Sequence, residues 1–137
     1  IAGDLNPKAA NLLKTNLASW TRKSTSSLSP SIVVCKDARA WKEDAELRGK
    51  ANVVLVNLPH DSFEHLPDLF PLFNPSGLGL VRGWAIVERT SLNGLVAKLE
   101  TMVVAAGGTP SDTLVSEVKG FSTTRCFVVF QSFITWH

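Results

Sequence analysis

The protein has 137 residues, of which 45% are apolar and 19% are charged. This length suits a single domain with a packed core, and this composition excludes a disordered chain and a coiled coil. Lys and Arg number 14 against 12 Asp and Glu, so the net charge of +2 is too small to indicate a nucleic-acid partner by itself. No apolar run approaches the ~20 residues of a membrane-spanning helix.

The first half of the chain alternates between strand and helix patterns. Asn6 followed by Pro7 marks a helix start, because Asn caps a helix N-terminus and Pro suits the first helical position. Apolar residues then recur at helical spacing, and a segment rich in Ser, Thr and Lys follows. The expected elements are a strand end at Ile1–Gly3, a helix over 7–20, a loop over Thr21–Pro30, a buried strand over Ser31–Cys35 and a mostly polar helix over Trp41–Arg48.

The second half continues this alternation and ends with two strands in succession. Ala51–Val56 is apolar on both faces, which is typical of a central parallel strand covered by helices. Pro67 and Pro71 divide the next helical pattern, so we expect two short helical pieces there. The expected elements are a strand over Ala51–Val56, helical pieces over Ser62–Phe73, a strand over Leu80–Glu88, a helix over Leu92–Ala106 and strands over Thr113–Val118 and Ser122–Ile134.

This order predicts one α/β domain over residues 1–137. Alternating strands and helices favour a doubly wound, mostly parallel sheet, and the last two strands close it with an antiparallel hairpin joined at Lys119-Gly120. In such a sheet, ligands bind beyond the carboxyl ends of the strands. Asp4, Asp37 and Asn57 each follow a predicted strand, so we expect them near one binding site.

Asp4 and its neighbour Leu5 follow the first strand. A carboxylate at this place can accept hydrogen bonds from both vicinal hydroxyls of a ribose, because it offers two acceptor oxygens. We therefore predict a nucleotide-type cofactor whose ribose meets Asp4, with Leu5 beside it. A plain cap for the helix that begins after Asn6 is the alternative interpretation.

Asp37-Ala38 follows the second strand and fits adenine recognition. The Asp37 side chain can accept a hydrogen bond from the exocyclic amine, while the Ala38 backbone N–H donates to a ring nitrogen. Ordinary turn chemistry at a strand end is the alternative.

The turn Asn57-Leu58-Pro59-His60 is the most specific motif. A planar substrate nitrogen must be held by acceptors, here the Asn57 side-chain oxygen and a neighbouring backbone carbonyl, while Pro59 stiffens the turn. Asn57 and Pro59 are therefore candidate catalytic residues, and Asn57 is also a cofactor-binding candidate. A strand-terminating turn is the alternative, and His60 either lines the pocket or is simply exposed.

The chain opens at Ile1-Ala2-Gly3 without an initiator Met, as if it began inside a strand. In nucleotide-binding folds of this type, the glycine-rich loop lies roughly 20 residues before the ribose carboxylate. Counting back from Asp4 runs off the sequence. We therefore expect a fragment that lacks the first strand and the glycine loop and is inactive by itself.

These motifs, in this order, resemble the Trm5/TYW2 family of tRNA-modifying enzymes, and the Asn-Leu-Pro turn is the most diagnostic of them. The resemblance covers nearly the whole chain. The segments that carry it are Asp4–Ala10 with Leu13–Asn16, Asp37–Arg39, Val54–Pro59 with Phe63–Leu66, and Val118–Lys119 with Arg125–Phe130.

The resemblance implies a Rossmann-like class I methyltransferase that moves a methyl group from S-adenosylmethionine (SAM) to N1 of guanosine 37 in tRNA. It implies that Asp4 holds the cofactor ribose, that Asp37 and Ala38 meet its adenine, and that Asn57 and Pro59 shape the guanine pocket. SAM is the expected cofactor and tRNA the expected partner. We expect a cytoplasmic monomer without a metal or a membrane partner, with mitochondrial or nuclear location left open.

Two other functions stay open. TYW2 uses the same cofactor to transfer an aminocarboxypropyl group to tRNA, and a non-catalytic domain of this fold could serve in protein or RNA interaction. Ser62-Phe63 and Phe121-Ser122-Thr123 depart from the family pattern, which has a small residue and an Ala-Pro pair there. Methylation of guanine N1 also needs a proton acceptor, for which Glu64 and Glu88 are weak candidates.

The remaining polar side chains give less specific expectations. Basic residues near strand ends could contact phosphate, with solvated surface charge as the alternative; they are Lys36, Arg39, Arg82 and Arg89. His65 is expected to face solvent from a helix. Cys35 and Cys126 are expected to be buried free thiols, because both lie in apolar, strand-like runs.

Overall fold

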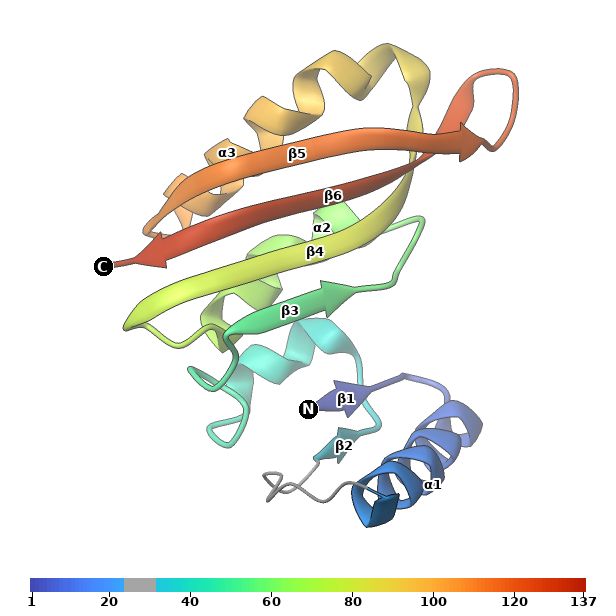
Figure 1. Cartoon of the computed structure of the whole chain (residues 1–137), viewed down its shortest axis with the longest axis vertical. Helices are drawn as coiled ribbons and strands as arrows, with labels where there is room; N and C mark the ends of the chain where they lie inside the picture. The colour runs from blue at the N-terminus through green and yellow to red at the C-terminus, as the bar shows by residue number, and fades with distance from the viewer. Residues whose placement is uncertain (24–31) are drawn as a thin grey trace.

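A computed structural model describes residues 1–23 and 32–137 of the chain. Strands and helices alternate up to α3, and two consecutive strands follow, as the sequence predicts (Figure 1). The elements are β1 (Ala2–Gly3), α1 (Pro7–Lys23), β2 (Val33–Val34), the 3-10 helix η1 (Ala38–Glu43), β3 (Val53–Val56), α2 (Ser62–Leu69), the 3-10 helix η2 (Phe70–Leu72), β4 (Gly77–Glu88), the 3-10 helix η3 (Arg89–Gly94), α3 (Leu95–Ala105), β5 (Gly108–Gly120) and β6 (Arg125–Trp136).

The strands form a parallel two-stranded sheet and a mixed four-stranded sheet. β1 pairs with β2 in parallel, and β3 pairs with β4 in parallel. β6 lies between β4 and β5 and runs antiparallel to both, which gives the order β3-β4-β6-β5. The predicted α/β class and C-terminal hairpin are confirmed. The predicted strand directions also agree with the structure, because β3, β4 and β5 of the four-stranded sheet run the same way and β6 runs against them. The position of β6 between β4 and β5 was not predicted.

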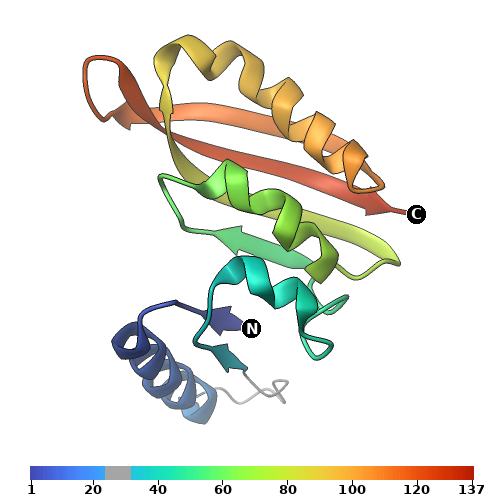
Figure 2. The same ribbon diagram turned by 180° about the vertical axis from the view of Figure 1, so that it is seen from behind.

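One face of the four-stranded sheet carries the core. Helices α2 and α3 both lie on this face, which Figure 2 shows from the helical side. Helix α3 buries Leu95, Leu99 and Val103, whose spacing of four residues puts them on one side of the helix. In the part of the chain that the structure describes, no helix covers the opposite face of this sheet.

Strand β3 differs from the prediction of a central strand covered on both faces. Val54 and Val56 are buried, whereas the side chains of Val53 and Leu55 are 53% and 67% exposed. β3 is also the edge strand of its sheet, next to β4. A run of apolar residues does not reveal whether both faces are covered, and in β3 one face opens into a cleft.

Two predicted helices have different bounds in the structure. The predicted helix over Trp41–Arg48 is the earlier 3-10 helix η1, which begins at Ala38 because the Asp37 side chain accepts the Arg39 N–H at 2.9 Å and caps it. The predicted helix over Leu92–Ala106 is divided between η3 and α3. The two predicted pieces within Ser62–Phe73 are confirmed as α2 and η2, although Pro67 lies inside α2.

The C-terminal hairpin is longer than predicted. β5 begins at Gly108 rather than Thr113, and a register shift between Ser111 and Leu114 interrupts its pairing with β6. Asp112, at φ 47°, lies in this irregularity, so the alternation that reveals a strand in sequence is broken there. The turn lies over 121–124 instead of at Lys119-Gly120. At the other end of the chain, α1 extends to Lys23, and the rest of the predicted loop over Thr21–Pro30 is outside the described residues.

Candidate functional site

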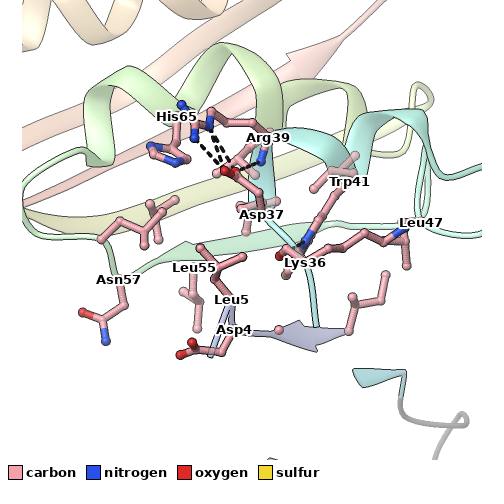
Figure 3. Close-up of a pocket in the computed structure, with 18 of the residues that line it drawn as sticks. Asp4, Leu5, Lys36, Asp37, Arg39, Trp41, Leu47, Leu55, Asn57 and His65 are labelled. Atoms are coloured by element: carbon pink, nitrogen blue, oxygen red, sulfur yellow. Dashed lines mark hydrogen bonds and ion pairs between the residues drawn. The ribbon is translucent and has the colours of Figure 1, made fainter. Parts of the chain in front are cut away.

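A cleft of about 720 Å³ lies along β1 and β3 (Figure 3). Its walls come from β1, α1, the segment that leads into η1, β3 and α2. Of the residues predicted to bind the cofactor or to shape the substrate pocket, the cleft brings together all but Pro59; these are Asp4, Leu5, Asp37, Ala38 and Asn57. They are far apart in sequence, and they meet because they follow the carboxyl ends of β1, β2 and β3.

Asp4 begins the turn between β1 and α1. Its Oδ1 accepts the Asn6 N–H at 2.8 Å, and the Asn6 side chain in turn accepts the Lys8 N–H at 3.0 Å, so Asn6 caps α1 as predicted. The cap contact that the sequence offered as the alternative for Asp4 is therefore present. It uses one carboxylate oxygen, and a carboxylate has further acceptor capacity for a ligand hydroxyl.

Arg39 holds Asp37 in a bidentate ion pair. Arg39 Nη2 lies 2.6 Å from Asp37 Oδ2, and Arg39 Nε lies 3.0 Å from Asp37 Oδ1. Hydrogen bonds from the Arg39 side chain and backbone hold the pKa of Asp37 well below its usual value. Arg39 thus fixes an ionised carboxylate in the cleft instead of being available to a phosphate.

The loop after β3 is fastened to β4 by two hydrogen-bonded contacts. The Pro59 carbonyl accepts the Ile86 N–H at 2.7 Å. The buried Ser62 hydroxyl lies 2.8 Å from the Leu58 carbonyl and 2.5 Å from the Trp84 carbonyl. The Leu58 and Pro59 carbonyls are therefore already used inside the protein, and the exposed Asn57 side chain is the acceptor that the turn presents to the cleft.

The histidines differ from their predicted places. His65 is half-buried and lines the cleft, with its ring Nδ1 2.9 Å from the Asp61 carbonyl. The prediction of a solvent-facing His65 is therefore wrong in part, because the side of α2 that bears it faces the cleft. His60 is exposed and is absent from the cleft lining, and its ring contacts Phe121 at 6.3 Å between centroids.

Trp41 is a lining residue that the sequence analysis missed. Its ring Nε1 donates to the Lys36 carbonyl at 3.1 Å, which holds the indole across the strand end of β1. A Cβ at Gly3 would collide with the Trp41 ring and would lie 2.8 Å from the Val34 carbonyl. Residue 3 must therefore be glycine for the Trp41 ring to lie against β1. No local motif marks this pair, since the contact depends on how η1 packs against β1.

The other predicted cations have partners within the protein. Lys36 pairs with Asp44 at 2.9 Å, and Arg89 pairs with Glu117 at 2.8 Å. Arg82 lies 3.4 Å from the Gln131 side-chain oxygen. These contacts favour the surface-charge interpretation over phosphate binding for these three residues.

Both cysteines are free, but they differ in burial. Cys126 is buried in β6, and burial raises the pKa of its thiol. Cys35 is exposed, contrary to prediction, because it follows β2 at the point where the chain leaves the small sheet. Within residues 1–23 and 32–137, no helix is long and apolar enough to cross a membrane, and no three His, Cys, Asp or Glu side chains are grouped to hold a metal ion.

No protein-family model matches the chain, and no curated protein matches it by sequence. Solved structures do match. TYW2 of M. jannaschii, in complex with SAM (AdoMet), matches 98% of this chain with a TM-score of 0.76 and 18% identity. Trm5b of Pyrococcus abyssi matches 98% with a TM-score of 0.73 and 15% identity, and the M. jannaschii tRNA m1G37 methyltransferase matches 98% with a TM-score of 0.65 and 19% identity.

This chain spans 57%, 37% and 37% of the length of those three proteins, in the order given. At such identities the likeness concerns the fold. The chain therefore shares an α/β fold with a mixed sheet with TYW2, Trm5b and the tRNA m1G37 methyltransferase.

Proposed function

We propose that residues 1–137 form part of the catalytic domain of a SAM-dependent tRNA methyltransferase that acts on N1 of guanosine 37. The observation that supports this most is the convergence of Asp4, Asp37 and Asn57 on one cleft. The same cleft belongs to a fold shared with TYW2 and Trm5b. Because these proteins are longer than this chain, the activity is proposed for a protein that contains residues 1–137.

The donor set of the cleft fits the proposed cofactor. SAM supplies an electrophilic methyl group carried on a sulfonium. Asp4 would accept from the ribose hydroxyls, with the apolar Leu5 beside it, and Asp37 and the Ala38 N–H would meet the adenine edge. Arg39 keeps Asp37 ionised and oriented, which suits an acceptor for the adenine amine.

Asn57 would hold the target guanine by its side-chain oxygen. Pro59 would shape the pocket through the backbone, since its carbonyl accepts the Ile86 N–H and its ring restricts the turn. The reaction also needs a group that takes the N1 proton. Neither Glu64 nor Glu88 lines the cleft, whereas His65 does, so we propose His65 as the acceptor in place of the two glutamates.

The arrangement of the two sheets supports the proposed Rossmann-like class I architecture. β1 and β3 point the same way in both views. Among the residues that the structure describes, β1 pairs with β2 and β3 pairs with β4, so the edges of β1 and β3 that face each other are unpaired. The cleft separates these two open edges and is lined there by Ile1, Gly3, Val53 and Leu55. A further parallel strand placed between them would join the two sheets into one, and we propose that this strand and its glycine loop belong to the complete domain.

A second candidate function is the transfer of an aminocarboxypropyl group to tRNA. The observation in its favour is that TYW2 matches this fold at least as well, with a TM-score of 0.76, as Trm5b and the m1G37 methyltransferase do, with 0.73 and 0.65. Both reactions would use the same cleft for the cofactor. The mass added to tRNA distinguishes them, because a methyl and an aminocarboxypropyl group differ greatly in size.

The test is an assay on tRNA with SAM, using a form of the protein in which the strand and glycine loop precede Ile1. We expect methylated guanosine by mass spectrometry of the digested tRNA, and no product from Asn57→Ala. The matched control is Asn52→Ala, since Asn52 is an exposed asparagine at the opposite end of β3. Unchanged turnover in Asn57→Ala would exclude the proposed role, and an aminocarboxypropyl product would establish the second candidate.

A further inference from the structure

The turn between β5 and β6 holds an exposed aromatic ring. Phe121 is 49% exposed, and the His60 ring meets it edge-on at 79° between the ring planes. The Arg125 guanidinium lies over the Phe121 ring, 5.2 Å from its centroid. We call the side chains of His60, Phe121 and Arg125 the hairpin platform.

The turn that carries Phe121 is closely hydrogen-bonded. The N–H groups of Phe121 and Ser122 both donate to the Arg125 carbonyl at 3.0 Å. The Arg125 N–H donates to the Ser122 hydroxyl at 3.1 Å, and the Arg89 N–H donates to the Thr124 carbonyl at 2.8 Å. A ligand that binds here meets an aromatic ring that is already positioned, so little conformational entropy is lost on binding.

The hairpin platform lies next to the candidate site. His60 comes two residues after Leu58, which lines the cleft, and the Pro59 carbonyl between them is bonded to Ile86 of β4. Figure 1 shows the β5–β6 turn at the end of the sheet toward which β3 and β4 point, which is the end where Asn57 lies. A nucleic acid whose base enters the cleft would therefore pass over this turn.

The charges around the platform suit a negatively charged strand. Arg125 is 3.9 Å from Glu88, and Arg89 is 2.8 Å from Glu117. Lys119 adds a third cation, with its Nζ 5.7 Å from the Phe127 ring centroid. Glu117 occupies Arg89, so Arg125 and Lys119 are the cations that an RNA backbone could meet. Both lie over aromatic rings, and sites for single-stranded nucleic acid combine cations and aromatic rings in this way.

We propose that the hairpin platform stacks an unpaired RNA base that neighbours the target nucleotide. The identity of the partner rests on the proposed function. An aromatic face accepts any base, so this contact would position the RNA strand without reading its sequence. Phe121-Ser122-Thr123 is also where the chain departs from the family resemblance, so the platform is a feature of this sequence.

The test is the affinity of the chain for an RNA stem–loop with an unpaired loop, measured by fluorescence anisotropy without SAM. Loss of one stacked base costs on the order of 1–3 kcal/mol, so we expect Phe121→Ala to weaken binding by about 5-fold to 150-fold. Phe121→Trp keeps an aromatic face and should bind like the wild type. The matched control is Phe133→Ala, because Phe133 is a 38% exposed phenylalanine nearer the other end of β6 and should not affect binding.

The outcomes separate this inference from the proposed function. Equal affinities of Phe121→Ala and wild type for the RNA, or no measurable binding by the wild type, would overturn the proposal that the hairpin platform stacks a base. Neither result would bear on the proposed SAM site. A loss in Phe121→Ala that Phe133→Ala reproduces would also overturn it, since any exposed phenylalanine would then serve. A selective loss in a protein that fails to methylate tRNA would support the platform and count against the proposed reaction.

Discussion

At the scale of single residues, Asp37 shows how the cleft keeps a charged acceptor. Arg39 lowers the pKa of Asp37, so the pair is fully formed above the ordinary Asp value of about 3.9 and its contribution to stability is lost as the pH falls toward the lower folded value. We expect Arg39→Ala to return the Asp37 pKa toward its ordinary value in an NMR titration of the side-chain carboxyl. Arg82→Ala, which removes a different surface arginine, should leave that titration unchanged. An Asp37 titration that stays low without Arg39 would contradict this cause.

Ser62 gives the second prediction at this scale. Its buried hydroxyl is within hydrogen-bond distance of the Leu58 and Trp84 carbonyls. The hydroxyl carries one proton, so Ser62→Ala removes one buried hydrogen bond to these carbonyls, and we expect the free energy of unfolding to fall by about 1–3 kcal/mol in urea titration. Ser91→Ala is the control, because the exposed Ser91 hydroxyl donates to the Glu88 carbonyl at 2.7 Å and its loss should cost much less. Equal effects of the two variants would show that Ser62 does not fasten the loop.

The sequence predicts the cleft residues that follow strand ends better than the cleft residues that are placed by helix packing. Asp4, Asp37 and Asn57 were predicted to lie near one another because strand patterns locate the binding edge of a sheet, and all three line the cleft. Trp41 and His65 were not, because their places in the cleft depend on how η1 and α2 pack. Asp4 also shows that two interpretations can both apply, since its cap contact is present and it still lines the cleft.

At the scale of elements, α3 attaches to the sheet by one apolar side. Leu99 is fully buried and Val104, on the same helix, is 61% exposed. We expect Leu99→Ala to lower the free energy of unfolding by about 2–5 kcal/mol, from lost burial and the cavity left behind. Val104→Ala should change it by roughly 0.5 kcal/mol or less in the same denaturant titration. A small effect of Leu99→Ala would mean that α3 does not pack as described.

The order of the elements could be predicted from the sequence. Which strand faces are covered, and where the elements begin and end, could not. Periodicity identifies α3 and β4 because their apolar side chains follow one period throughout. β3 has the sequence of a doubly covered strand, yet Val53 and Leu55 face a cleft. The start of β5 was missed because the irregularity around Asp112 hides the strand alternation.

At the scale of the whole molecule, the division into two sheets organises the candidate site. The cleft lies along β1 and β3, and the side chains proposed to bind the cofactor follow β1, β2 and β3. Sequence patterns give the order of strands along the chain but not which edges pair, so the division could not be predicted from periodicity. We propose, above all, that this cleft binds SAM.

Calorimetric titration with SAM tests that claim most directly, on the chain and on a form that supplies a strand and glycine loop ahead of Ile1. We predict binding by the extended form, weakened by about tenfold or more in Asp4→Asn, because a neutral amide is a poorer acceptor for two hydroxyls. Asp112→Asn, an exposed aspartate on β5 away from the cleft, should bind like the unmodified protein. No binding by either form, or equal affinity in Asp4→Asn, would contradict the account and reduce Asp4, Asp37 and Asn57 to turn residues.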